Sequence, residues 1–175
     1  LVEIICEIFA SPVRPAMSIV VVRPSKVYGP GDKFDPERSH VTAALIRKVA
    51  ERHEPVEVWG TGEDVRDLIY IDDFLDGLVH AAEVDDDFFT VNVASGTGTS
   101  VRKLLATILE IDGRPQAAVR FDPSKPSTIP VLRVSTERAL ARLGFHAQIP
   151  PPEGLRRTLE WYRRHHLGTD LRQAS

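Results

Sequence analysis

Two periodicities alternate along the chain, and together they predict a layered α/β fold. Short apolar runs rich in β-branched residues have the pattern of strands, and segments whose apolar residues recur every three to four positions have the pattern of amphipathic helices. Strands are expected at residues 18–23, 56–59, 65–71, 89–94, 118–121 and 131–134. Helices are expected at residues 1–10, 40–52, 73–83, 100–111, 135–144 and 153–166.

Only two of these strands, 18–23 and 89–94, have the continuous apolar pattern of a parallel sheet covered on both faces. The other predicted strands are short and have polar edges. Two strands do not make a self-sufficient doubly wound sheet, so the pattern predicts part of a larger fold. The segment 1–10 opens in the middle of a helical pattern, and we expect that helix to be cut at its start.

Residues that favour helix ends and loops delimit these elements. Ser39 is expected to cap the helix 40–52, Asp72 the helix 73–83, and Thr99 or Ser100 the helix that follows. A capping role and the helix dipole explain the adjacent carboxylates of Asp72 and Asp73 without a metal or acid–base function. The segment 24–38 is predicted to be a loop at the carboxyl end of a buried strand, where α/β folds place their ligands.

Composition and charge exclude several classes of function. The 175 residues include 22 Lys and Arg against 25 Asp and Glu, a net charge of −3 without a basic patch for nucleic acid or an anionic membrane. Cys6 is the single cysteine, which excludes an intramolecular disulfide and a zinc site built on several thiolates. No apolar run approaches the roughly 20 residues of a membrane-spanning helix. We therefore expect a cytoplasmic protein without a metal site.

Four stretches of the chain form a recognisable series. They are IVVVRPSKVYGP (19–30), VWGTGEDVRDLIYIDD (58–73), VNVASG (91–96) and EGLRRTLEWY (153–162). In this order they resemble the C-terminal half of extended short-chain dehydrogenase/reductases that act on nucleotide sugars, the NAD-dependent epimerase/dehydratase family. The resemblance implies the C-terminal part of a Rossmann-like α/β fold with a small mixed α/β substrate-binding subdomain. It makes residues 1–175 a single partial unit that lacks the N-terminal dinucleotide-binding part.

Two further stretches narrow the resemblance within that superfamily. DKFDPERSHVTAALIRK (32–48) and FDPSKP (121–126) are most similar to the GDP-L-fucose synthases. That subfamily carries out NADPH-dependent epimerisation and reduction of GDP-4-keto-6-deoxymannose. The resemblance therefore implies a nucleoside-diphosphate sugar as ligand, most specifically a GDP-sugar, NADP or NAD as cofactor in the intact family member, and a homodimer.

The resemblance also assigns roles to single residues. His40 corresponds to the general acid of the epimerisation, a task that suits a side chain whose ordinary pKa lies near neutrality. Lys48 corresponds to a basic residue that contacts the sugar nucleotide. Trp59 corresponds to an aromatic ring in the nucleotide pocket, and Arg66 to a donor to the oxygens of the nucleotide. Without the resemblance, Trp59 is interpreted as a core aromatic residue and Arg66 as part of a surface ion pair with Asp64 or Asp67.

The cofactor-binding positions follow the strand 18–23. Pro24, Ser25, Lys26 and Val27 match the segment whose backbone borders the nicotinamide in the family, together with His40. Lys26 stands where the family has Asn, and a lysine cannot accept hydrogen bonds as an amide does. Ser127 stands where the fucose synthases have an acidic residue after the FDPSKP stretch, and its hydroxyl is expected to replace that contact.

Two catalytic patterns of the intact family do not occur in these 175 residues. They are the Gly-x-x-Gly-x-x-Gly turn that holds a pyrophosphate and the Tyr-x-x-x-Lys pair that moves a proton. We therefore expect the chain to be inactive in hydride transfer alone and its own cofactor binding to be weak or absent. Two alternatives stay open: a noncatalytic module that binds a nucleotide sugar or dimerises, and a nucleoside-diphosphate-sugar 4-epimerase or dehydratase of the same superfamily.

Overall fold

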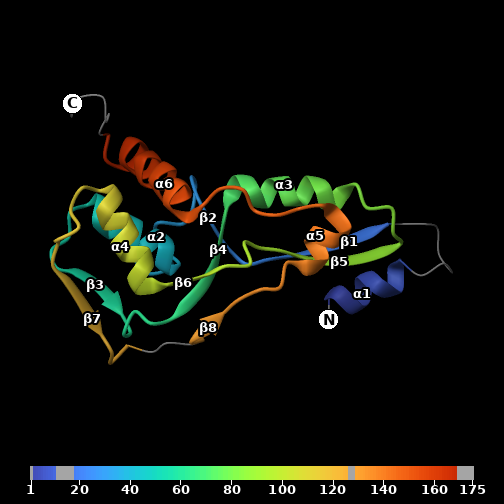
Figure 1. The fold of residues 1–175 in the computed structure, drawn as a ribbon, viewed down its shortest axis with the longest axis horizontal. Helices are drawn as coiled ribbons and strands as arrows, with labels where there is room; N and C mark the ends of the chain where they lie inside the picture. The colour runs from blue at the N-terminus through green and yellow to red at the C-terminus, as the bar shows by residue number, and fades with distance from the viewer. Residues whose placement is uncertain (1, 11–17, 126–128, 169–175) are drawn as a thin grey trace.

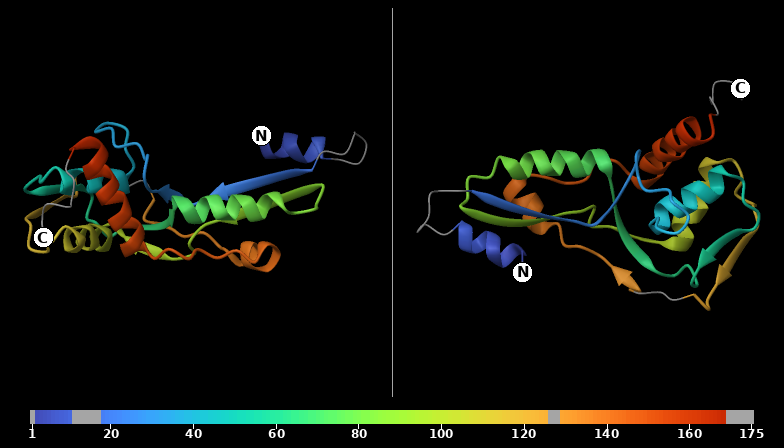
Figure 2. Two further views of the ribbon diagram at one scale, coloured as in Figure 1. Left: turned by 90° about the horizontal axis from the view of Figure 1, so that it is seen from above. Right: turned by 180° about the vertical axis from the view of Figure 1, so that it is seen from behind.

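The computed structural model describes residues 2–10, 18–125 and 129–168, which form an elongated α/β molecule (Figure 1). One end contains β1 (Ile19–Pro24) and β5 (Phe88–Val93), which pair in parallel from Ile19 opposite Phe88 to Pro24 opposite Val93. Helix α3 (Ile71–Ala82) covers one face of this pair, and α1 (Val2–Phe9) lies on the other face (Figure 2). The parallel pairing of these two strands confirms the prediction, although β1 is only half-buried.

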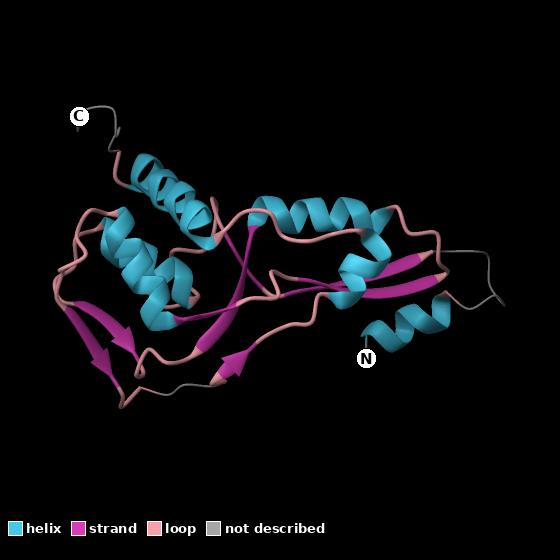
Figure 3. Cartoon of the chain, in the orientation of Figure 1, coloured by secondary structure: helices cyan, strands magenta, loops and turns pink. Residues whose placement is uncertain are grey.

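The middle of the molecule is built around β4 (Val65–Tyr70). It pairs in parallel with β2 (Lys26–Tyr28) and β8 (Val131–Leu132), and antiparallel with β6 (Gly98–Ser100) (Figure 3). The prediction of a loop over 24–38 was wrong for β2. Its three residues align with Leu68, Ile69 and Tyr70, and Tyr28 is buried, because the chain crosses from the β1 sheet to β4 at this point.

The far end contains a two-stranded parallel ribbon and three helices. The ribbon pairs β3 (Val56–Trp59) with β7 (Val119–Asp122). Val56 and Val58 point into the core, whereas Glu57 and Trp59 are exposed, as the period of two in a strand requires. The helices α2 (Val41–Ala50), α4 (Val101–Ile111) and α6 (Pro151–His166) pack against one another beside the ribbon. The short helix α5 (Glu137–Leu143) returns to β5.

The apolar side chains form two separate clusters. The larger cluster lies among α2, α4, α6 and the ribbon and includes Leu45, Leu105 and Leu159. The smaller cluster lies between α3 and β5 and includes Phe89 and Val91. Strand β4 contributes to both, because Leu68 and Tyr70 belong to the larger cluster and Ile69 between them belongs to the smaller one.

Some of the predicted helix caps differ from the observed ones. Ser100 accepts from the backbone N–H of Lys103 at 3.2 Å and caps α4 as predicted. The N-cap position of α2 is His40 rather than Ser39, and that of α3 is Tyr70 rather than Asp72. Asp73 instead accepts from the backbone N–H groups of Gln148 and Ile149, at 3.1 and 2.9 Å, so its carboxylate fixes the segment that leads into α6.

A second buried carboxylate, that of Asp67 on β4, organises the neighbouring loops. It accepts four hydrogen bonds, from the N–H and Oγ of Ser95 at 3.1 and 2.8 Å and from the N–H groups of Gly96 and Val134 at 3.1 and 3.3 Å. Asp67 is completely buried. The turn after β5 and the segment after β8 are therefore both fixed to β4 by one side chain.

Within the described residues, no helix has the length and apolar character needed to cross a bilayer. The same part of the chain contains no group of three or more His, Cys, Asp and Glu side chains placed to hold a metal ion.

Candidate functional site

Trp59 is the centre of the candidate site, because it lines three adjoining hollows. It ends β3, and its side chain is 67% exposed. The interpretation of Trp59 as a core aromatic residue was therefore wrong. We name the hollows after one residue of each: the His40 hollow of about 280 Å³, the Lys48 hollow of about 220 Å³ and the Arg120 hollow of about 330 Å³.

The His40 hollow brings together five of the residues singled out in the sequence. They are Lys26, Val27, His40, Trp59 and Arg66. They come from β2, the start of α2, the end of β3 and the start of β4, so residues up to 40 positions apart in the sequence meet at one site. The structure places Pro24 and Ser25 just before this group, at the end of β1, and neither lines the hollow.

His40 is exposed in this hollow and occupies the N-cap position of α2 with extended backbone angles, φ −70° and ψ 161°. Its side chain caps no amide of the helix. The imidazole is consequently not used to hold α2 and lies where a ligand in the hollow would reach it.

The loop that carries His40 is fixed at its middle. Phe34 is buried in an aromatic cluster of α6, with its ring centroid 4.7 Å from that of Tyr162 and 6.0 Å from that of Trp161. Asp35 accepts from the N–H groups of Glu37 and Arg38 at 2.9 and 3.0 Å. These contacts define the path of the loop towards α2 and limit the positions that His40 can take.

Lys48 lines the Lys48 hollow together with Arg47, Glu57 and Trp59. Its ammonium donates to the backbone carbonyl of Glu57 at 2.7 Å, which ties α2 to β3. Burial, with a smaller contribution from the neighbouring Arg47, lowers the pKa of Lys48. The Lys48 hollow thus contains a cation that is anchored to the backbone of β3.

Arg66 is largely buried and has several partners on the wall of the His40 hollow. Its guanidinium donates to the carbonyls of Ile129 and Val65 at 2.6 and 2.9 Å and pairs with Asp64 at 3.1 Å. The predicted ion pair with Asp64 is therefore present, but it is largely buried and not on the surface. The Arg66 side chain also lines the His40 hollow.

Ser25 is the position that bears on a nicotinamide cofactor. Its N–H donates to the carbonyl of Val93 at 3.2 Å, and its Oγ is buried without a hydrogen-bond partner among the described residues. A buried hydroxyl with this property fits a polar ligand group beside the end of β1.

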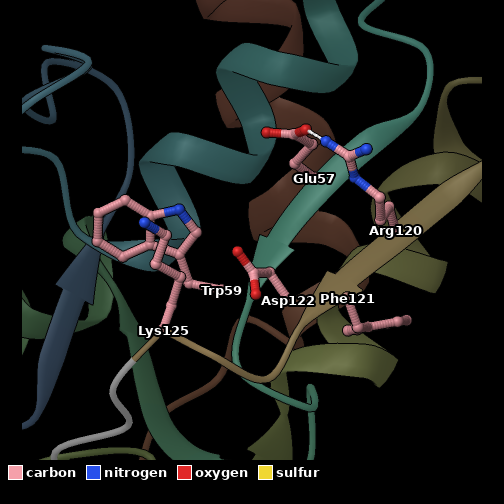
Figure 4. A pocket seen from close by; sticks show the side chains of 6 residues that line it. All are labelled: Glu57, Trp59, Arg120, Phe121, Asp122 and Lys125. Atoms are coloured by element: carbon pink, nitrogen blue, oxygen red, sulfur yellow. Dashed lines mark hydrogen bonds and ion pairs between the residues drawn. The ribbon is translucent and has the colours of Figure 1, made fainter.

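The Arg120 hollow contains a residue that the sequence reasoning missed (Figure 4). Lys125 extends over the Trp59 ring, with its Nζ 5.6 Å from the ring centroid. The FDPSKP stretch was noted in the sequence, and the lysine within it was the signal that could have identified this cation. Ser127 lies outside the described residues.

Comparison with protein families and curated proteins gives consistent results. A model of the NAD dependent epimerase/dehydratase family matches residues 2–94. Probable GDP-L-fucose synthase 1 of Oryza sativa subsp. japonica is 31% identical over 86% of this chain and 46% of that protein. GDP-L-fucose synthase of Escherichia coli K12 is 32% identical over 81% of this chain and 47% of that protein. dTDP-4-dehydro-6-deoxy-D-allose reductase of Streptomyces bikiniensis is 32% identical over 85% of this chain and 44% of that protein.

Solved structures show the same relationship. UDP-glucose 4-epimerase of Thermotoga maritima, determined with UDP-glucose, has a TM-score of 0.80 and 29% identity over 93% of this chain and 50% of that chain. MoeE5, determined with UDP-glucuronic acid and NAD, has a TM-score of 0.76 and 28% identity over 90% of this chain and 51% of that chain. The chain thus spans about half the length of the relatives that it matches.

Proposed function

Because the chain belongs to the NAD dependent epimerase/dehydratase family, we propose that it is the nucleotide-sugar-binding half of an epimerase/reductase of the GDP-L-fucose synthase type. The proposed reaction of the whole enzyme is 3,5-epimerisation and NADPH-dependent 4-reduction of GDP-4-keto-6-deoxymannose. One observation carries the proposal. Lys26, His40 and Arg66 line a hollow together with the exposed Trp59, Lys125 lies over the Trp59 ring, and Lys48 lines a second hollow that Trp59 also borders.

This arrangement suits a nucleoside-diphosphate sugar. An exposed indole offers a face on which a base stacks. Lys125 lies over that ring and Lys48 lines an adjoining hollow, and both would balance the charge of a diphosphate as point charges. The sugar would then extend into the His40 hollow, which is the hollow that contains a titratable imidazole.

In the proposed reaction, His40 donates a proton to carbon. A base outside this chain removes a C–H proton next to the keto group, and the electron pair moves to the carbonyl oxygen to give an enolate. The His40 imidazolium then protonates the same carbon from the opposite face, which inverts it, and the carbonyl reforms. The extended backbone and exposed position of His40 at the start of α2 support this role, because the residue lines the hollow.

The cofactor would meet this chain at its nicotinamide end, where it supplies the hydride for the 4-reduction. Pro24, Ser25, Lys26, Val27 and His40 are the residues proposed to border it, supported by the buried and unpartnered Ser25 hydroxyl. Neither the pyrophosphate-binding glycine turn nor the Tyr-x-x-x-Lys pair occurs in the 175 residues. We therefore expect this chain to bind a nucleotide sugar more readily than NADPH.

A 4-epimerase or dehydratase acting on another nucleotide sugar is the second candidate. The likeness to UDP-glucose 4-epimerase favours it, as does Lys26 at the position where the family pattern has Asn. A noncatalytic module that binds a nucleotide sugar shares the same hollows and differs only in lacking turnover.

The proposal includes a homodimer of the intact protein and a cytoplasmic location. Exposed apolar side chains of α1 support the dimer, namely Val2, Ile4, Ile5 and Ile8. The single cysteine supports a reducing compartment.

The proposal is tested by calorimetric titration of the 175-residue protein with GDP and with NADPH. GDP is expected to bind and NADPH not to bind. Trp59→Ala is expected to weaken GDP binding about tenfold, because base stacking on an aromatic ring contributes about 1–3 kcal/mol. Leu75→Ala, which truncates another exposed apolar side chain on α3, serves as the control and should leave binding unchanged. Failure of wild-type protein to bind GDP or any other nucleoside diphosphate would refute the proposal.

A further inference from the structure

Arg47 lines the Lys48 hollow and has no role assigned so far. It lies on α2 next to Lys48, and its side chain is 13% exposed. Ser39 and Trp59 line this hollow and also the His40 hollow, so the two hollows adjoin at these residues. One extended ligand can therefore occupy both hollows.

Only one nitrogen of the Arg47 guanidinium has a partner. Nη1 donates to Oε2 of Glu51, one helical turn further on, at 3.1 Å. Nε is buried without a hydrogen-bond partner, and Nη2 donates to no group in the part of the chain that the structure describes. Nε and Nη2 lie on the same edge of the planar guanidinium, and such an edge donates two parallel hydrogen bonds to a carboxylate or a phosphate.

We infer that Arg47 binds a phosphate group of the nucleotide through its Nε and Nη2 edge. This role rests on the proposed function, because it needs a nucleoside diphosphate in these hollows. It adds a binding residue next to Lys48, the position to which the family resemblance points. Arg47 supplies paired donors, whereas Lys48 supplies charge.

Lys48 is less free to make the paired contact. Its ammonium donates to the backbone carbonyl of Glu57 at 2.7 Å, and this hydrogen bond holds α2 against β3. Burial, and after it the charge of Arg47, lowers the pKa of Lys48, so the two adjacent cations repel each other. An anion in the hollow offsets that repulsion, and a diphosphate carries enough charge to face both.

Two carboxylates line the same hollow and leave the cations available. Glu57 is paired with Arg120 of β7 (Figure 4). Glu37 is exposed in the loop before α2, where solvent screens its charge. Neither carboxylate pairs with Arg47 or Lys48 among the described residues. Both cations can therefore meet an anionic ligand.

Glu51 fixes the orientation of Arg47. Its Oε2 accepts from Arg47 and also lies 3.0 Å from Nε2 of His53, and its Oε1 accepts from the hydroxyl of Tyr162 on α6 at 2.7 Å. Burial raises the pKa of Glu51, but the hydrogen bond from Tyr162 and the neighbouring Arg47 and His53 outweigh burial and leave that pKa below its usual value. An ionised carboxylate held by groups from two helices keeps the guanidinium in one place.

An ion pair within α2 explains only part of this arrangement. A pair of residues at positions i and i+4 stabilises a helix weakly, and a lysine would serve as well as an arginine. An arginine that uses one nitrogen on Glu51 leaves the buried Nε of Arg47 unpaired, which is unfavourable unless an acceptor occupies the hollow. A ligand therefore explains the unpaired edge better than the helix does.

The test compares nucleoside diphosphates with their nucleosides by calorimetry. GDP, guanosine, UDP and uridine are each titrated into wild-type protein, Arg47→Lys and Arg47→Gln. Arg47→Lys keeps the charge but loses the paired donors, so it should weaken diphosphate binding about tenfold and leave nucleoside binding unchanged. Arg47→Gln also removes the charge and should weaken diphosphate binding further.

Arg156→Gln is the matched control. Arg156 also pairs with carboxylates of its own helix, with Glu153 at 2.9 Å and with Glu160 one turn further on, and it lines none of the three hollows. This variant should bind all four ligands as the wild type does. Thermal unfolding of every variant checks that it is folded.

The outcomes separate the role of Arg47 from the proposed function. Undiminished binding of the diphosphates by Arg47→Lys overturns the paired contact and leaves the proposed function standing, even if Arg47→Gln binds more weakly, because charge alone then suffices. An equal loss for diphosphates and nucleosides also overturns it, because that result indicates that Arg47 shapes the hollow and does not contact the phosphate. Absence of binding of every nucleoside diphosphate to wild-type protein overturns both.

Discussion

Asp67→Asn is expected to lower the free energy of unfolding by about 3 kcal/mol, because each hydrogen bond to a buried charged group contributes about 1.5–3 kcal/mol and the amide retains only part of them. Asp and Asn side chains have nearly the same volume, so the substitution creates no cavity that would add to the loss of stability. It replaces one of two oxygens that each accept two hydrogen bonds, and it turns an amide N–H towards other donors. Urea unfolding followed by circular dichroism measures the change.

The control for this prediction is Asp76→Asn. Asp76 is exposed on α3 and its carboxylate pairs with His80 at 3.7 Å, so its loss should change the free energy of unfolding by less than about 0.5 kcal/mol. If Asp67→Asn proved as mild as this control, the four hydrogen bonds would not be what fixes the turn after β5 and the segment after β8 to β4.

Gly154→Ala is expected to destabilise the protein by about 2 kcal/mol, although alanine is favoured over glycine in a helix by about 1 kcal/mol. A Cβ at this position of α6 would lie closer to the Tyr28 hydroxyl oxygen than real carbon atoms approach, and 2.9 Å from the Tyr70 ring. The Tyr28 hydroxyl lies there because it is buried between β2 and α6, within reach of the carbonyl of Pro151 at 3.5 Å. Thermal and urea unfolding report the loss.

Rescue by a second substitution identifies the cause. Tyr28→Phe removes the oxygen that the new methyl group meets, so Gly154→Ala should cost about 1 kcal/mol less in the Tyr28→Phe background than in the wild type. Equal costs in both backgrounds would exclude the Tyr28 hydroxyl as the cause and place the effect in the helix itself or at the Tyr70 ring.

Much of the fold could be predicted from the sequence because its signals are local. The period of two in β3 and the capping hydroxyl of Ser100 both act within a few residues, and both elements occur where expected. β2 was missed because it consists of only three residues, Lys26–Tyr28, which are too few to show the alternation that identifies a strand. The Asp72 cap was wrong because α3 begins at Ile71, which places Asp72 inside its first turn. The role of Asp73 was missed because its partners are backbone groups 75 and 76 positions further on, which no local pattern shows.

The candidate site was predicted by resemblance more than by physics. Single positions such as His40 and Arg66 carry no periodic signal, and only the matching stretches around them directed attention there. The proximity of Lys26, His40 and Trp59 depends on the meeting of three elements, which the structure provides. Lys125 was overlooked because its position over the indole depends on the path of the chain after β7, and the residues themselves show only a Pro-rich loop.

The alternation of side chains along β4 has a consequence for dividing the molecule into smaller parts. Leu68 and Tyr70 face the larger apolar cluster and Ile69 faces the smaller one, so a single strand serves as a wall for both. A shortened chain that ends on either side of β4 would open both clusters, because the larger one draws on residues from Tyr28 to Tyr162 and the smaller one on residues from Ile69 to Phe145. The two ends of the molecule therefore cannot be separated into independently stable pieces by one cut, and shorter binding modules derived from this chain need to retain β4 together with the elements of both clusters.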